Sequence, residues 1–273
     1  MASIPKKIHY CWLSGEPMPK DILRYMQTWQ DKMPDYELVL WDKNKFDIDS
    51  VAFVREACAA KKFASASDYI RAYALYSEGG IYLDTDVIVK KSFSEFLGAG
   101  FFTAVQYSPD IVAERQQNIA DLLTADGRLK NNLDAAIVCV PGICLQPEIM
   151  GGAAGHPYLK DVLSWYENRP FRSQGLTYTE TCAAPDVYTT IATKHGFHYK
   201  NELQFFGQDM VVYPFPIFVG NLKYATKESY AVHLGTGGGV GLNLSERLRK
   251  KIRLNKFLRK LAGHKTVDDI LKM

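Results

Sequence analysis

The sequence lacks the features of a membrane-spanning, disulfide-bonded or zinc-binding protein. Its longest apolar run, residues 135–145, is interrupted by Pro141 and Gly142 and is too short to cross a bilayer. Its cysteines number five, an odd count, and none forms a CxxC pair, which favours reduced thiols over a disulfide framework or a zinc site. Residues 4–7 lead directly into a strand-like stretch, so no signal peptide is expected. These absences predict a cytoplasmic protein.

The order of patterns along the chain predicts an α/β fold. The chain has 273 residues, of which 47% are hydrophobic and 23% charged, a composition and length that suit one large globular domain or a domain with a small appendage. Alternating strand and helix patterns indicate an open sheet whose ligands bind beyond the carboxyl ends of its strands. Strands are expected at residues 7–13, 36–41, 101–106, 135–140 and 209–215, and helices at 20–32, 50–62 and 67–77.

Two carboxylates, Asp84 and Asp86, interrupt an apolar run that reads GGIYLDTDVIV. Burying an unpaired carboxylate in an apolar layer is costly, so the pair needs a partner or a turn that faces water. Two carboxylates one residue apart at a strand end are well placed to share a hard cation such as Mg²⁺ or Mn²⁺, which substrate phosphates often complete. The pattern therefore favours a cation site for a phosphorylated ligand, with solvated turn residues as the alternative.

An acid and an arginine lie just upstream on the expected helix. Asp68 and Arg71 are three residues apart, so their side chains share one helical face. An arginine can hold phosphate oxygens with two parallel hydrogen bonds, and a carboxylate can accept hydrogen bonds from sugar hydroxyls. The helix feeds directly into the strand of Asp84, which predicts that all of these groups meet at one strand end. A solvated ion pair of little consequence is the alternative.

Together these motifs resemble glycosyltransferase family 32, a group of bacterial capsular and oligosaccharide transferases that includes yeast initiating mannosyltransferases. The signature reads SDYIRAYALYSEGGIYLDTD, and the stretches IPKKIHYCWLSGEPMP and PDYELVLWD resemble the family's first two strands. The similarity is strongest over residues 4–92 and is more remote to clostridial cytotoxin glucosyltransferase domains. It implies a GT-A type, Rossmann-like nucleotide-sugar-binding fold with a mixed, mostly parallel central sheet.

The resemblance also implies a role for each matching residue. Trp12 would stack on the nucleotide base, and Tyr82 would lie near the donor. Asp68 and Arg71 would contact the donor sugar and diphosphate, and Asp84 and Asp86 would bind ribose and metal, which makes Asp84, Asp86 and Arg71 the expected catalytic residues. His233 would reach the metal or diphosphate, and Asp186 is an acceptor-side candidate. Many relatives have a second histidine or a tryptophan after that histidine and a later Ser-Trp pair, where this chain has Leu234-Gly235-Thr236 and three glycines.

The expected function is therefore a Mn²⁺- or Mg²⁺-dependent retaining glycosyltransferase. It would move a hexose from a nucleoside-diphosphate sugar, with UDP-sugars favoured and GDP-mannose second, to a glycan or lipid-linked acceptor in surface polysaccharide (capsule) synthesis. Two alternatives stay open. One is a haloacid-dehalogenase-type phosphatase with Asp84 as nucleophile and Asp86 as acid/base, although no later Gly-Asp-Asp-like motif follows. The other is a sugar-nucleotide-binding protein without turnover.

The positive charge of the chain is concentrated near its end. Residues 243–273 hold ten Lys/Arg and three acids, a net +7, whereas the whole chain is +3. Large apolar residues interleave with these basic ones, which suits an anionic lipid surface better than nucleic acid, and no nucleic-acid motif is present. We expect a glycosyltransferase domain over residues 1–241 and a basic amphipathic helical tail over 242–273, peripheral to the inner face of the cell membrane.

Overall fold

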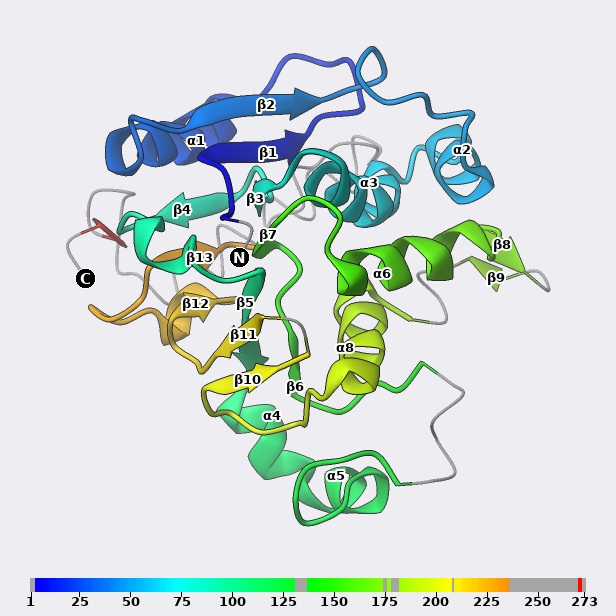
Figure 1. Cartoon of the computed structure of the whole chain (residues 1–273), viewed down its shortest axis with the longest axis vertical. Coiled ribbons are helices and arrows are strands. Elements are labelled where there is room, and N and C mark those ends of the chain that lie inside the picture. Colours follow the sequence, from blue (N-terminus) through cyan, green and yellow to red (C-terminus); the bar gives the residue numbers. More distant parts are fainter. Residues whose placement is uncertain are drawn as a thin grey trace.

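An eight-stranded sheet forms the centre of the computed structural model, which describes residues 3–130, 137–173, 176–177, 182–207, 209–235 and 270–271. Its strands follow one another in the order β10-β11-β5-β7-β3-β1-β2, and β6 pairs with β5 (Figure 1). The strands are β1 (Lys7–Cys11), β2 (Glu37–Trp41), β3 (Gly80–Leu83), β5 (Phe101–Tyr107), β6 (Ile143–Leu145), β7 (Ile149–Gly152), β10 (Gln204–Phe206) and β11 (Met210–Tyr213).

The sheet is mixed, and most of its strands point the same way. The pairs β1–β2, β1–β3 and β5–β11 are parallel, whereas β7 runs antiparallel to both β3 and β5. Strands β1, β2, β3, β5 and β11 therefore share one direction, and β6, β7 and β10 run opposite to it. This confirms the expected α/β class with a mostly parallel central sheet.

Helices and a second sheet cover the two faces of the central sheet. The helices are α1 (Lys20–Lys32), α2 (Ala52–Ala59), α3 (Phe63–Glu78), α4 (Pro109–Glu114), α5 (Gln116–Leu122), α6 (Pro157–Glu167) and α8 (Ala184–His195). Residues of α2, α3, α6 and α8 pack together in one core cluster, and those of α1 in the other. Strand residues divide between the clusters by alternation: Tyr82 belongs to the first cluster, and Ile81 and Leu83 belong to the second.

Helix α1 matches the predicted range of residues 20–32 because its apolar residues recur at helical spacing. Ile22, Met26 and Trp29 are buried along one face. The Trp29 indole also donates a hydrogen bond to the backbone carbonyl of Val87 at 2.8 Å. The helix is therefore fixed to β4 (Val87–Val89), the strand that follows the two carboxylates.

The expected strand at residues 135–140 is wrong for its described part, residues 137–140, which form no strand. The backbone N–H of Val138 instead donates to the Thr190 hydroxyl on α8, and Pro141-Gly142 then turns the chain. The strands of this region are β6 and β7. Strand β7 was missed because it ends in two glycines, which have low β-propensity. Gly151 has room for no side chain, since a Cβ there would lie 2.2 Å from the Phe102 ring.

A small sheet in the order β12-β13-β4 carries two of the expected site residues at its ends. Its other strands are β12 (Phe218–Val219) and β13 (Ala231–His233), and the 3-10 turns η1 (Ser94–Phe96) and η2 (Leu222–Tyr224) and a two-stranded ribbon of β8 (Arg172–Ser173) and β9 (Leu176–Thr177) complete the elements. Ile88 and Val232 pair across this sheet and pack with Ile270. The expected tail, 242–273, lies outside the described residues except for residues 270–271, and its assignment as a separate element stays a prediction.

A buried histidine explains why the site strand begins with glycine. The Nδ1 atom of His9 accepts a hydrogen bond from the Trp41 indole at 2.9 Å, and its Nε2 atom lies 2.8 Å from the carbonyl oxygen of Gly79. The ring is therefore neutral, with its proton on Nε2, and burial lowers the pKa of His9. Gly80 has a φ of +130°, and a Cβ there would lie 2.8 Å from His9 Nε2.

We predict that Gly80→Ala lowers the free energy of unfolding by about 2–4 kcal/mol, because it adds overpacking against His9 to backbone strain. Gly98→Ala is the matched control: a Cβ at Gly98 meets nothing within 4 Å, and its φ is not positive. Urea unfolding of both variants measures the difference. Equal stabilities would show that the His9 contact does not constrain the start of β3.

Candidate functional site

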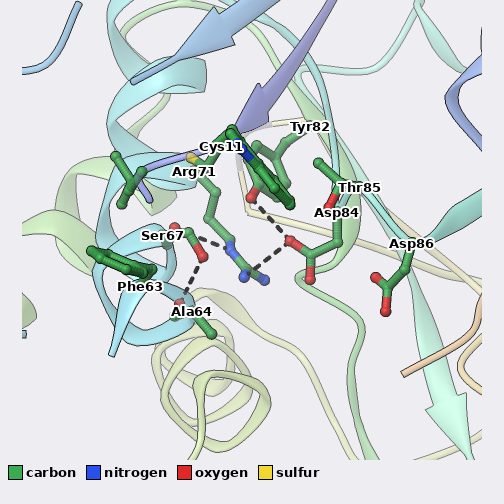
Figure 2. A pocket seen from close by; sticks show the side chains of 11 residues that line it. Cys11, Phe63, Ala64, Ser67, Arg71, Tyr82, Asp84, Thr85 and Asp86 are labelled. Atoms are coloured by element: carbon green, nitrogen blue, oxygen red, sulfur yellow. Dashed lines mark hydrogen bonds and ion pairs between the residues drawn. The ribbon is translucent and has the colours of Figure 1, made fainter. Parts of the chain in front are cut away.

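Five of the expected site residues line a hollow beyond the carboxyl ends of the parallel strands β1 and β3 (Figure 2). This is the edge at which open α/β sheets bind ligands. Helix α3 also contributes to the lining, and it runs directly into β3 with a single glycine, Gly79, between them. The lining includes Trp12 after β1, Arg71 on α3, Tyr82 on β3, and the stretch Asp84-Thr85-Asp86.

Asp84 and Asp86 interrupt the apolar run because the chain changes sheets between them. Leu83 ends β3 in the central sheet, and Val87 begins β4 in the small sheet. The backbone turns at this junction, where the N–H of Val87 donates to the carbonyl of Asp84 at 3.0 Å. Both apolar flanks are therefore buried in different layers, while the two carboxylates project from the junction.

Arg71 is a buried cation held between two carboxylates. It is 3% exposed, and its Nη2 atom lies 3.0 Å from Asp68 Oδ1 and 3.3 Å from Asp84 Oδ1. Burial by itself lowers the pKa of Arg71, but Asp84, Tyr82 and Asp68 outweigh it and raise the pKa well above its usual value, so the group stays charged. The guanidinium also lies over the Tyr82 ring, 5.0 Å from its centroid. Its second terminal nitrogen, Nη1, is buried and has no hydrogen-bond partner among the described residues.

The Asp84 carboxylate accepts hydrogen bonds from two side chains of the site. Its Oδ1 atom accepts hydrogen bonds from Arg71 and from the Tyr82 hydroxyl, the latter at 2.9 Å. Figure 2 shows Asp84 lying between the guanidinium and Asp86. The carboxylate therefore connects the arginine to the second aspartate.

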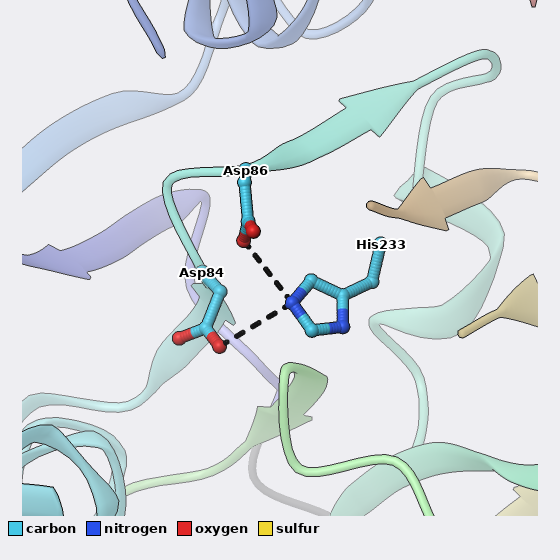
Figure 3. A group of neighbouring side chains, drawn as sticks. All are labelled: Asp84, Asp86 and His233. Atoms are coloured by element: carbon cyan, nitrogen blue, oxygen red, sulfur yellow. Dashed lines mark ion pairs between the residues drawn. The ribbon is translucent and has the colours of Figure 1, made fainter. Parts of the chain in front are cut away.

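His233 joins the two aspartates from the end of β13 (Figure 3). Its Nε2 atom lies 3.1 Å from Asp86 Oδ1 and 3.8 Å from Asp84 Oδ2. Antiparallel pairing of β13 with β4 sets His233 opposite Val87, which brings together two residues that are 146 positions apart in the chain. Burial alone lowers the pKa of His233, but Asp86, then Glu148 and Asp84, outweigh it and raise the pKa to about 9.

The Asp84, Asp86 and His233 group fits a divalent cation. One ligand atom from each residue lies within 4.8 Å of the others, and Asp86 is buried. Carboxylate oxygens suit Mg²⁺ and Mn²⁺, and an imidazole nitrogen is also acceptable to Mn²⁺. Without a cation, two adjacent carboxylates repel each other, and the protonated imidazole compensates for part of that repulsion.

Trp12 also lines the hollow. The residue is half-buried, and its indole N–H donates to the carbonyl of Glu16 at 2.6 Å, which fixes the ring orientation. It also lines a second hollow, formed with the loop that follows β2, including Asp42 and Asn44. A ring placed between two hollows presents a flat face on which an aromatic base can stack.

Asp186 lies outside this constellation. It occupies the first turn of α8, where its Oδ2 atom accepts a hydrogen bond from the backbone N–H of Ala183 at 3.1 Å. An acidic residue at the third helical position makes this contact to the N-cap N–H in a capping box. Asp186 is not among the residues that line either hollow beside Trp12.

Glu148 belongs to the site, although the sequence gives no signal for it. The residue follows Pro147 in what resembles a solvated turn, but its carbonyl accepts a hydrogen bond from the N–H of Asp84 at 3.0 Å. Its Oε2 atom is buried without a hydrogen-bond partner in the described structure. Burial raises the pKa of Glu148, and the positive charges of His233 and Arg71 oppose this shift. Only the pairing of β7 with β3 brings it here.

Comparisons with known proteins find similarity to glycosyltransferases. Residues 19–102 match the family model described as "Glycosyltransferase sugar-binding region containing DXD motif". The chain is similar to an uncharacterized glycosyltransferase of Acanthamoeba polyphaga mimivirus, with 31% identity over 36% of this chain and 42% of the relative. It is 36% identical to inositol phosphoceramide mannosyltransferase 3 of Schizosaccharomyces pombe over 32% of this chain and 25% of the relative.

Among solved structures, the PaToxG glycosyltransferase is similar over 71% of this chain and 70% of its own, with 18% identity and a TM-score of 0.49. The matches to the mimivirus and Schizosaccharomyces pombe relatives each span less than half of the relative's length. The matched region contains Asp68, Arg71, Tyr82, Asp84 and Asp86. The chain therefore carries, in residues 19–102, a glycosyltransferase sugar-binding region with the DXD motif, and the family resemblance inferred from its sequence is confirmed.

Proposed function

We propose that the protein is a metal-dependent, retaining glycosyltransferase that transfers a hexose from a nucleoside-diphosphate sugar to a glycan or lipid-linked hydroxyl. The observation that carries the proposal is the junction of a buried, partly unpaired guanidinium with the Asp84, Asp86 and His233 group. A diphosphate is the ligand that suits both, because its oxygens can accept from Arg71 and share a cation. The matched sugar-binding region supplies the reaction class.

Each residue then has a physical task. The bond from the anomeric carbon to the diphosphate oxygen breaks as a bond from that carbon to the acceptor hydroxyl oxygen forms, and the hydroxyl proton passes to an oxygen of the departing diphosphate. Negative charge therefore grows on the leaving group as its bond to the sugar breaks. Arg71 stabilises that charge, because its buried guanidinium acts in a medium of low dielectric. Asp68 and Tyr82 hold Arg71 and Asp84 in place. Trp12 binds the base, and Asp186 remains a candidate for contact with the acceptor.

Asp84, Asp86 and His233 would hold the divalent cation. When bound, Mn²⁺ or Mg²⁺ supplies positive charge that neutralises the diphosphate and favours its departure. The three side chains come from the sheet junction and from β13, so their relative position depends on the pairing of β4 with β13. Nothing in the described residues supplies an obvious protein nucleophile for the transfer.

The donor is proposed to be a UDP-sugar, with GDP-mannose as the second candidate. The UDP preference rests on the resemblance of the donor signature to uridine-dependent relatives. The name of the Schizosaccharomyces pombe relative, a mannosyltransferase, supports mannose as the transferred sugar. A screen of nucleotide sugars separates the two donors directly.

The two alternatives have less support. A phosphatase has less support because the family match is to a glycosyltransferase sugar-binding region, and no later Gly-Asp-Asp-like motif follows Asp84 and Asp86. A binding protein without turnover would keep the same contacts, and a measured rate of donor hydrolysis excludes it.

The acceptor and the cellular location of the protein are proposed from the sequence. No helix that the structure describes is long and apolar enough to cross a membrane. We keep the proposal that the basic residues of 243–273 bring the protein to an anionic cytoplasmic membrane surface, near a lipid-linked acceptor for surface polysaccharide.

We expect the protein to hydrolyse its donor slowly in the presence of Mn²⁺ or Mg²⁺, and Asp86→Asn to lower that rate by about 10²–10³-fold, the usual effect of losing one stabilising interaction with a leaving group. The screen uses UDP-glucose, UDP-galactose, UDP-N-acetylglucosamine and GDP-mannose. Asp126→Asn, which changes an exposed carboxylate, is the matched control and should keep the wild-type rate. Full activity of Asp86→Asn, or of the wild type in chelator, would contradict the metal-dependent proposal.

The raised pKa of His233 predicts a pH-dependent affinity for Mn²⁺. Nε2 must lose its proton before it can bind a cation, so the affinity should rise about tenfold per pH unit between pH 6.5 and 8, below the pKa of about 9. Protonation of His233 also stabilises the folded state when no cation is bound. This stabilisation is complete below about pH 6.5, the pKa of the histidine in the unfolded chain, and is lost as the pH rises through about 9. Calorimetric titration with Mn²⁺ tests the affinity, with His233→Ala as the variant in which the slope should disappear. A constant affinity of the wild type would exclude His233 as a ligand.

A further inference from the structure

Two buried polar atoms of opposite character lack partners in the site. Arg71 Nη1 is a donor, and Glu148 Oε2 is an acceptor; neither has a hydrogen-bond partner among the described residues. A buried polar atom without a hydrogen bond typically costs about 1–3 kcal/mol. The two do not pair with each other, so a ligand that brings both an acceptor and a donor would relieve both costs.

The backbone places Glu148 beside the reacting groups. Antiparallel pairing sets Ile149 opposite Leu83, and the residues next in line, Glu148 and Asp84, are joined by a backbone hydrogen bond. That hydrogen bond joins Glu148 directly to Asp84, whose carboxylate belongs to the cation group. Asp84 also contacts Arg71 and lies near His233, so Glu148 is the neighbour in the sheet of a residue that meets both charged parts of the site.

The other carboxylates of the site are already engaged. Asp84 accepts hydrogen bonds from Arg71 and Tyr82, and Asp68 is paired with Arg71. Asp86 is paired with His233. Among the acids in the described part of the chain, Glu148 alone has a buried oxygen without a hydrogen-bond partner.

Charge decides which part of a nucleotide sugar Glu148 can bind. The group of ligand atoms that could hold one cation consists of Asp84, Asp86 and His233 and does not include Glu148. A diphosphate oxygen carries negative charge and would be repelled by a carboxylate. The sugar hydroxyls remain, because each is a neutral donor that an ionised carboxylate accepts well.

We propose that Glu148 determines sugar specificity by accepting a hydrogen bond from one hydroxyl of the transferred sugar, while Arg71 Nη1 donates to the donor diphosphate. This inference rests on the proposed function, since it assumes a nucleotide-sugar donor. It adds a contact with the sugar from the β6–β7 connection. A site built to hold a hydroxyl rejects a sugar that lacks it, because the carboxylate is then left buried and unpaired.

The test measures donor hydrolysis by the wild type, Glu148→Ala and Glu148→Gln with Mn²⁺, using the nucleotide sugar that the wild type hydrolyses fastest. Analogues of that donor that lack one hydroxyl each form the second arm. The wild type should lose at least about tenfold in kcat/KM with one deoxy donor. With the full donor, the kcat/KM of Glu148→Ala should be lower than that of the wild type by a similar factor. Replacing the full donor by that deoxy donor should not lower the kcat/KM of Glu148→Ala any further. Glu148→Gln, which keeps an acceptor oxygen, should discriminate between the two donors to an intermediate degree.

The affinity for the free nucleoside diphosphate should stay within about twofold of wild type in both variants, because that ligand has no transferred sugar. Glu114→Gln, an exposed carboxylate-to-amide change, controls for the substitution itself. If Glu148→Ala discriminates among the deoxy donors as the wild type does, or if both variants lose nucleoside diphosphate affinity, the inference is wrong. A wild type that neither binds nor hydrolyses any nucleotide sugar would instead overturn the proposed function.

Discussion

The buried ion pair between Arg71 and Asp84 is the interaction on which the site depends. A guanidinium that is 3% exposed is stable only where carboxylates compensate for its desolvation, and Asp68 and Asp84 do so from two sides. The pair joins helix α3 to the turn that follows β3. Removing Arg71 would leave Asp68 and Asp84 without their shared cation, and removing Asp84 would leave the buried guanidinium with one carboxylate in place of two, so the shape of the site and its electrostatics have one common origin.

The second constraint is the change of sheet at Asp84-Thr85-Asp86. Because β3 and β4 belong to different sheets, the junction presents its polar groups where the two layers separate. His233 arrives from the far end of the sequence through pairing of β13 with β4, and Glu148 arrives through pairing of β7 with β3. The side chains of the site thus come from three separate stretches of chain: the junction that holds Asp84 and Asp86, the residue before β7, Glu148, and the end of β13, His233.

The sequence could predict the parts of the site that depend on local spacing. Asp68 and Arg71 share a helical face, Asp84 and Asp86 follow one strand, and Trp12 ends another, so short-range periodicity already indicates their neighbours. Glu148 could not be predicted, because its place depends on the pairing of a strand that ends in Gly151 and Gly152 and has no strand signature. The expected strand at 135–140 failed for the same kind of reason: its described backbone is bonded by a side chain of α8, which no local pattern shows.

The account requires that a divalent cation and a nucleoside diphosphate occupy the site together. The most direct measurement is the calorimetric affinity of UDP and of GDP, first in chelator and then in saturating Mn²⁺. We expect Mn²⁺ to raise the affinity of one of them by about tenfold or more, and that nucleotide to raise the affinity for Mn²⁺ by the same factor, as linkage demands. Equal affinities for both nucleotides with and without the ion would contradict the shared site at Arg71, Asp84, Asp86 and His233.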